Sequence, residues 1–418
     1  MTRVLKLSTY RRLLAVYSLN ELAWGFGSLA LAVLVYNRTG SALAAAGYFL
    51  CAMFAPALVS PALVARLDQR ASRPVLVALY SIEAVIFGIL AWVAGRFALA
   101  PVLVLVLADG VIAVTARALT RTATVGVTSA AGLLREGNAV TNAAFSVCYM
   151  VGPALGGVAV ALGGAVTALV ITSGVFVAMG FTLATAPGMP GAPSERRAVA
   201  GRLRSALRYA RGQPIVRTLL GLLTAGMLFA TIPTPAEVVL AVHTLHGGAG
   251  GYGALLSAWG AGAVIGSGVY ARWRELPART MITLGVGFLG AGFVVMAVAP
   301  GLAVASAGAA IAGIGNGTMF VASRTALQEA VDGSWMALMM SLTESIIQGV
   351  PGVGILLGGG LTAVWGSRVA VAAGGIGSLA TAIAVWVSLR RAAAATLAPA
   401  AHEPPGSVEP PEPTTVAP

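Results

Sequence analysis

The sequence predicts an all-α membrane protein of twelve transmembrane helices in two pseudo-symmetric six-helix bundles. Of the 418 residues, 58% are hydrophobic and only 10% are charged, with a mean hydropathy of +0.88. A soluble domain carries roughly a quarter charged residues, so most of this surface must face lipid. The chain also contains twelve apolar runs of about the 20 residues that a helix needs to cross a bilayer core of about 30 Å.

The apolar runs indicate helices rather than barrel strands, because they are continuous and too long for strands. The predicted spans are 13–36, 44–65, 74–94, 98–119, 139–162, 164–186, 218–241, 249–271, 278–298, 302–325, 337–362 and 367–389. They give an N-terminal bundle (1–186), a cytoplasmic linker (187–217), a C-terminal bundle (218–391) and a Pro- and Ala-rich tail (392–418) that we expect to be disordered. Around 199–211 the basic linker is either an amphipathic helix on the inner leaflet or a flexible segment.

The basic residues predict the orientation. With both termini in the cytoplasm, the external loops hold only Arg38, Arg96 and Arg368, which leaves 26 − 3 = 23 basic residues on the cytoplasmic side. This asymmetry follows the positive-inside rule, so the net charge of +12 reports membrane topology and no nucleic-acid partner is expected. Basic residues other than Lys6 are all arginine, and Ala and Gly are abundant, which favours a bacterial plasma membrane.

A glycine pattern recurs in both halves of the chain. Gly152, Gly156 and Gly157 lie in the fifth predicted span with Pro153, and the run Gly354–Gly359 in the eleventh span repeats their spacing. Each pattern follows an arginine by a similar interval, 31 residues after Arg121 and 30 residues after Arg324. Small residues let helices approach closely in lipid. A duplicated six-helix unit is typical of transporters.

The chain resembles the major facilitator superfamily over nearly all of residues 10–391. The resemblance rests on the six-plus-six layout, the basic linker, the Gly152–Gly157 segment and the loop Pro61–Arg73. That loop is similar to a degraded form of the family motif Gly-x-x-x-Asp-Arg-x-x-Arg-Arg, with Arg66, Asp68 and Arg70 as its charged residues. Asn20-Glu21 and the segment 133–142 most resemble the drug and siderophore exporter branch.

Four acids fall near the middle of predicted spans: Glu21, Glu83, Asp109 and Glu344. A carboxyl in the bilayer costs about 2.5 kcal/mol or more, so each is a functional candidate by default. The resemblance implies that the first and fourth spans line a central substrate cavity, which favours Glu21 and Asp109 for proton coupling; Asn20 and Glu344 are further candidates for proton coupling or the substrate cavity. The alternatives are a structural pairing of Glu21 or Asp109 with Asn20, Arg117 or Arg121, an interhelical hydrogen bond for Glu344, and a paired or outward-facing Glu83.

Other residues are candidates for gating. Arg117, Arg121 and Arg324 lie near the inner ends of their predicted spans and either anchor them or close a cytoplasmic gate. Pro233 and Pro235 should bend or break the seventh span, since each removes a backbone donor. Several aromatic residues either pack the bundles or line a cavity for an apolar substrate: Tyr17, Trp24, Phe26, Tyr149, Phe229 and Trp259.

These features predict a secondary active transporter that exports an amphipathic small molecule, a drug, siderophore or secondary metabolite, in exchange for protons. The alternative is an importer or facilitator with the same fold. A phosphate-binding loop of the Walker type needs a lysine, and Lys6 lies outside any such motif, so neither an ATP-driven pump nor an enzyme is expected. We expect a monomer without cofactor; His243 and His246 with Glu237 are interpreted as solvated residues rather than metal ligands.

Overall fold

The computed structural model describes residues 3–67, 72–185, 208, 210–273, 275–331 and 333–397. Within these ranges every regular element is a helix. The first bundle is built from η1 (Val4–Lys6), α1 (Ser8–Thr39), α2 (Ala42–Phe49), the π-helix η2 (Leu50–Phe54), α3 (Ala55–Leu67), α4 (Ser72–Gly95), α5 (Leu99–Ala130) and α6 (Leu134–Ala184). The second is built from α8 (Pro214–Thr231), α9 (Pro233–Val239), the π-helix η3 (Leu240–Thr244), α10 (Gly248–Arg272), α11 (Ala278–Val298), α12 (Leu302–Ala330), α13 (Gly333–Trp365) and α14 (Ser367–Leu397).

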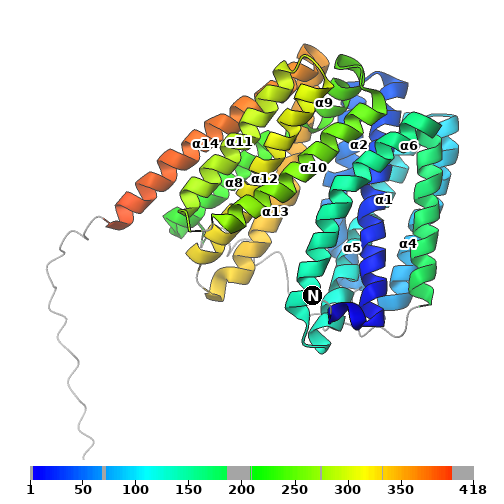
Figure 1. Cartoon of the computed structure of the whole chain (residues 1–418), viewed down its shortest axis with the longest axis horizontal. Helices are drawn as coiled ribbons and strands as arrows, with labels where there is room; N and C mark the ends of the chain where they lie inside the picture. Colours follow the sequence, from blue (N-terminus) through cyan, green and yellow to red (C-terminus); the bar gives the residue numbers. More distant parts are fainter. Residues whose placement is uncertain are drawn as a thin grey trace, which may run out of the picture.

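Eleven helical segments among the described residues are long and apolar enough to cross a membrane. One of them, within α6, contains both the fifth and the sixth predicted spans. Gly164 interrupts α6 with φ 75° and ψ 171°, a conformation that favours glycine. Figure 1 shows the two halves of α6 as two rods that meet at a turn, which is consistent with twelve crossings.

The seventh predicted span is interrupted at its prolines. α8 ends at Thr231, α9 begins at Pro233, and the π-helix η3 follows. Proline cannot donate to the preceding turn, which explains why the regular helix stops there. Ile232 between α8 and α9 keeps helical dihedral angles, so Ile215–Thr244 remains one helical span whose hydrogen-bond pattern is interrupted at the prolines and again at the π-helix.

Two helices are longer than the sequence predicted. α5 continues eleven residues past the predicted end of its span, to Ala130, and in this extension Thr124 donates to the Thr120 carbonyl at 2.8 Å and Thr128 to the Thr124 carbonyl at 2.9 Å. α14 continues to Leu397 through an alanine run of high helix propensity, into the segment expected to be disordered. The remaining tail, 398–418, and most of the linker, 186–207, lie outside the described residues.

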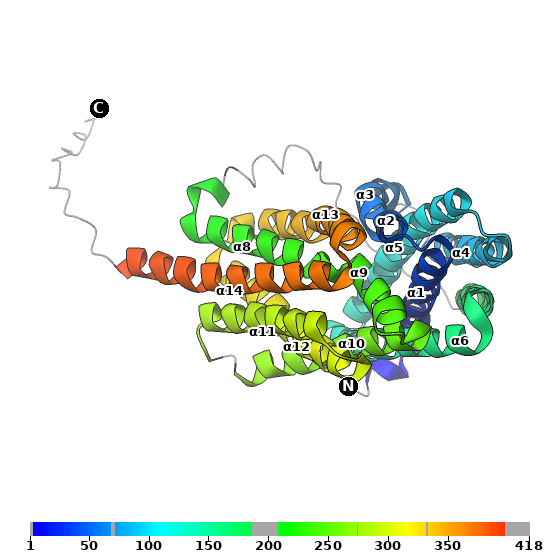
Figure 2. The same ribbon diagram turned by 90° about the horizontal axis from the view of Figure 1, so that it is seen from above.

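The two bundles meet at one end and separate at the other. In Figure 1 they converge near α9, α2 and the turn of α6, and they diverge toward the end that carries the N-terminus. Figure 2 shows the same two bundles side by side from above. Close backbone approaches mark the convergent end: a methyl group at Gly157 would lie 2.9 Å from the Ala249 carbonyl oxygen, and one at Gly359 would lie 2.5 Å from the Ala46 Cβ.

The repeated glycines make equivalent contacts in the two halves. Gly152 and Gly156 pack against α1 of their own bundle, at Leu22 and Phe26, while Gly157 packs against α10 of the other bundle. Their counterparts Gly354 and Gly358 pack against the α8–α9 junction of their own bundle, and Gly359 packs against α2 of the other. The third glycine of each pattern is therefore a contact between bundles.

Candidate functional site

A cavity of about 300 Å³ lies between the two bundles. Its walls come from α1, α2, η2 and α6 of the first bundle and from α8, α9, α10, α11 and α12 of the second. This volume is at the lower end of the range for small-molecule sites. Eight aromatic side chains line it: Trp24, Tyr48, Phe49, Tyr149, Tyr252, Trp259, Phe293 and Phe320.

Three of these rings form a continuous wall across the bundle boundary. The Trp24 and Tyr149 ring centroids are 6.1 Å apart with nearly parallel planes, and the Tyr149 and Trp259 centroids are 5.7 Å apart. Trp24 comes from α1, Tyr149 from α6 and Trp259 from α10. The wall therefore changes if the bundles move relative to each other. Of the other aromatic candidates, Phe229 packs against Gly377 of α14, and Phe26 lies against Gly156.

Glu237 is the charged residue among those that line this cavity; the others are apolar, aromatic or neutral polar, including Thr234 and Asn316. It lies on α9, one turn after Pro233. The sequence offered a signal, an acid in an apolar span, but counting along the span placed Glu237 near the outer end with the histidines. The structure instead places it at the interface of the bundles. No three His, Cys, Asp or Glu side chains of the described ranges are grouped as metal ligands would be.

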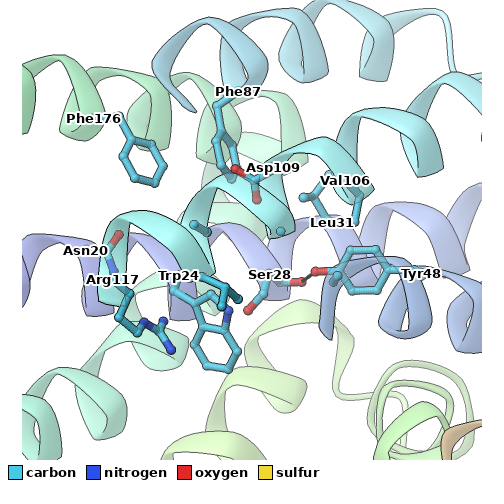
Figure 3. A pocket seen from close by; sticks show the side chains of 14 residues that line it. Asn20, Trp24, Ser28, Leu31, Tyr48, Phe87, Val106, Asp109, Arg117 and Phe176 are labelled. Atoms are coloured by element: carbon cyan, nitrogen blue, oxygen red, sulfur yellow. Dashed lines mark hydrogen bonds between the residues drawn. The ribbon is translucent and has the colours of Figure 1, made fainter. Parts of the chain in front are cut away.

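A smaller cavity of about 60 Å³ lies inside the first bundle (Figure 3). Asn20, Asp109 and Arg117 line it, and Trp24, Ser28 and Tyr48 line both cavities. The Tyr48 hydroxyl donates to the Ser28 backbone carbonyl at 2.9 Å, and this bond holds the Tyr48 side chain in place between the two cavities. The two cavities are therefore neighbours that share one wall.

Glu21 forms an ion pair with Arg117 beside this small cavity. Arg117 Nε lies 3.0 Å from Glu21 Oε1, and the side chain of Glu21 is 1% exposed while that of Arg117 is 35% exposed. The Arg117 guanidinium also lies over the Trp24 ring, 5.6 Å from its centroid. The sequence placed Arg117 near the end of its span, but α5 continues to Ala130, so Arg117 is an interior residue paired across to α1.

Glu83 and Asp109 have no such partner within the described residues. Glu83 is 0% exposed, and neither of its carboxyl oxygens has a hydrogen bond; Asp109 Oδ1 is also buried without one. The charge of Asp109 acts on Glu83, so the two carboxyls are close enough to interact. The structure therefore does not show the outward-facing or hydrogen-bonded Glu83 considered from the sequence.

The remaining charged candidates are distributed differently. Arg324 lies over the Phe320 ring, 5.3 Å from its centroid, and the two line a separate small cavity within the second bundle. Arg121 is exposed on α5. Glu344 lies on α13 and Arg66 on α3, but their side chains are outside the described part, as are residues Asp68 and Arg70.

This fold is that of a membrane transporter, and comparisons support the assignment. The crystal structure of nucleoside transporter NupG superposes with a TM-score of 0.75 at 11% identity, covering 92% of this chain and 100% of that one. A bacterial homologue of the iron transporter ferroportin, in an inward-facing state, gives 0.69 at 14% identity, covering 91% and 98%. A bacterial homologue of human Spinster, inward-facing and unoccupied, gives 0.63 at 14%, covering 91% and 94%.

A family model described as transmembrane secretion effector, of the major facilitator type, matches residues 119–412. The chain belongs to this family, and it is a multi-pass membrane transporter of the major facilitator superfamily. No curated protein matches the chain.

Proposed function

We propose that this protein is a secondary active exporter that exchanges an amphipathic small molecule for protons by alternating access. The observation that carries the proposal is the pairing of an aromatic cavity between the bundles with buried acids directly behind its wall. The aromatic cavity suits an apolar or amphipathic compound. The acids supply groups that can gain and lose a proton close to that compound.

The arrangement of the bundles supports alternating access. They are in contact at one end through Gly157 and Gly359 and diverge at the end that carries the N-terminus (Figure 1). By the positive-inside rule we assign the divergent end to the cytoplasm of a bacterial cell, with both termini there. Rocking about the cavity would open the glycine contacts and expose the same aromatic wall to the outside.

Glu21 is the acid best placed to couple protons to substrate. Its partner Arg117 lies over the ring of Trp24, which lines the central cavity. Protonation of Glu21 would weaken the ion pair with Arg117, and a shift of Arg117 would in turn alter its contact with Trp24. Asp109 lines the small cavity beside Glu21 and is the second candidate for the proton, while Asn20 lines that cavity as a neutral polar group. The energy suffices: one proton moving through 100 mV releases about 2.3 kcal/mol, and a tenfold solute gradient costs about 1.4 kcal/mol.

The test is transport by purified protein in liposomes with an imposed pH gradient. A panel of fluorescent amphipathic compounds should move opposite to the proton flow, and a protonophore should abolish that movement. Glu21→Gln should still exchange labelled for unlabelled compound but should lose the response to the pH gradient, because an amide cannot carry the proton. Glu275→Gln is the matched control, since Glu275 is exposed in the loop before α11.

Movement in the same direction as the protons would favour the importer alternative. Transport that ignores the pH gradient for every compound on the panel would contradict the proposal, as would full coupling in Glu21→Gln together with the corresponding Asp109→Asn variant.

A further inference from the structure

We propose that the central cavity binds a lipophilic organic cation, with Glu237 as the residue that recognises its positive charge. This inference rests on the proposed exporter function, since it names the class of compound that the cavity takes. It starts from the contrast between the many aromatic rings and the one carboxylate among the described residues that line the cavity.

Glu237 faces the cavity without a partner of its own. It has no hydrogen bond or ion pair to any described residue, and its side chain is partly exposed to the cavity. A carboxylate in an apolar, water-poor site is unfavourable unless a positive charge or hydrogen-bond donors compensate it. A cationic ligand would supply that compensation from inside the cavity.

The aromatic surroundings favour the same class of ligand. Glu237 is close enough to Tyr149 and Tyr252 for its charge to act on both phenols. The faces of aromatic rings carry partial negative charge and attract ammonium and phosphonium groups within about 6 Å. Trp24 and Trp259, on either side of Tyr149, extend this surface across both bundles.

The nearby cations do not cancel this preference. Among the described residues that line the cavity there is no lysine or arginine. Arg117 lies behind Trp24 and is neutralised by Glu21 at 3.0 Å. Arg324 lies against Phe320 and has an interaction partner of its own. An anionic compound would therefore meet Glu237 with no compensating charge in the lining, whereas a cation would meet both the carboxylate and the rings.

The experiment measures binding to the purified protein in lipid nanodiscs, in mildly alkaline buffer, for three compounds of similar shape. These are tetraphenylphosphonium, the neutral triphenylphosphine oxide and the anion tetraphenylborate, measured by calorimetric titration with empty nanodiscs as the blank. The native protein should bind the cation about tenfold or more tighter than the neutral compound, a difference of about 1.4 kcal/mol or more. Glu237→Gln should remove that preference and change binding of the neutral compound by less than about twofold.

Two further variants separate charge recognition from a folding defect. Glu237→Asp keeps the charge and should keep the cation preference, while Glu275→Gln removes an exposed carboxylate and should behave like the native protein. Equal affinities for the three compounds in the native protein, or a cation preference that survives Glu237→Gln, would overturn the inference. Binding needs no proton gradient, so a failure here with intact proton exchange would leave the exporter proposal standing, and cation binding without proton-driven transport would do the reverse.

Discussion

The buried acids of this transporter differ in what surrounds each carboxyl. Glu21 has a guanidinium at 3.0 Å, Glu237 faces an aromatic cavity, and Glu83 is enclosed with neither oxygen hydrogen-bonded in the described part of the chain. A buried carboxyl that lacks partners costs free energy, and proteins keep such groups where function needs them. The three carboxyls therefore differ in their compensation: Glu21 has an ion-pair partner, Glu237 has neither a hydrogen bond nor an ion pair to a described residue, and Glu83 has no hydrogen bond to one.

Replacing Glu83 by methionine should stabilise the protein. Methionine has a similar length and no polar atoms, so the variant removes two unsatisfied buried oxygens. The free energy of unfolding should rise by about 1–3 kcal/mol, measured as a higher midpoint of thermal unfolding in detergent. Glu329→Met, at an exposed position of α12, is the control and should leave the midpoint nearly unchanged. A lower midpoint for Glu83→Met would mean that Glu83 has compensating contacts and would contradict this account.

Hydropathy alone identified Glu21, Glu83 and Asp109, because an acid in an apolar run is conspicuous whatever it contacts. Arg117 was one of three possible structural partners for Glu21 or Asp109, with Asn20 and Arg121, but the sequence could not select among them. Pairing depends on how α1 and α5 are rotated and offset against each other, and on α5 continuing past the predicted end of its span. Glu237 was missed for a related reason: depth along one helix says nothing about which surface the opposite bundle covers.

At the scale of the elements, the repeated glycines define how each bundle is held together and where the bundles touch. Their spacing was visible in the sequence and correctly indicated a duplicated unit. Which helix each glycine meets was not visible, because Gly156 and Gly157 are adjacent and yet face different bundles. Successive positions on a helix point about 100° apart, so two neighbouring glycines can serve two interfaces.

A methyl group at Gly157 should loosen the convergent end of the bundles. Its Cβ would lie 2.9 Å from a backbone oxygen of Ala249, and backbone cannot move aside as a side chain can. Overpacking of this kind costs about 1–3 kcal/mol, which should shift the population toward the state open at that end. The parent for this test carries Ser28→Cys as its single cysteine, with Cys51 and Cys148 replaced. A membrane-impermeant thiol reagent added outside should label the Gly157→Ala variant of this parent roughly tenfold faster than the parent itself.

Gly174→Ala provides the matched control for this experiment. It lies on the same helix α6, but a methyl group there would have no neighbour within 4 Å, so labelling at position 28 should stay at the parental rate. Equal labelling of Gly157→Ala and the parent would show that the contact between α6 and α10 does not hold that end closed.

On the scale of the whole molecule, the sequence predicted the all-helical architecture because composition and span length are direct consequences of the lipid environment. The interruption of the seventh span was also predictable, since Pro233 and Pro235 each remove a backbone hydrogen-bond donor from their own helical turn. The relative placement of the bundles was not, because it depends on contacts between residues far apart in the chain, such as Gly359 with Ala46. Trp24, Tyr149 and Trp259 were named as possible cavity residues and do line it, but the full set of lining residues depends on those distant contacts and was not predictable from local patterns.

Whether the chain crosses the membrane an even or an odd number of times is a property of the whole molecule that can be tested directly. α6 has 51 residues, which as one straight helix would extend about 76 Å and far exceed a bilayer core of about 30 Å. Its interruption at Gly164 makes it two crossings, so the chain should cross an even number of times and both termini should lie on the same side.

Reporter fusions measure this parity. A reporter that fluoresces only in the cytoplasm should be dark when fused after Gly163, which follows five crossings, and bright when fused after Thr185 or at the C-terminus. Alkaline phosphatase, active only outside, should give the opposite pattern at the same three positions, which guards against fusions that simply fail to accumulate. Active phosphatase at the C-terminus together with a cytoplasmic N-terminus would indicate an odd number of crossings, and the two-bundle arrangement around the cavity would then be wrong.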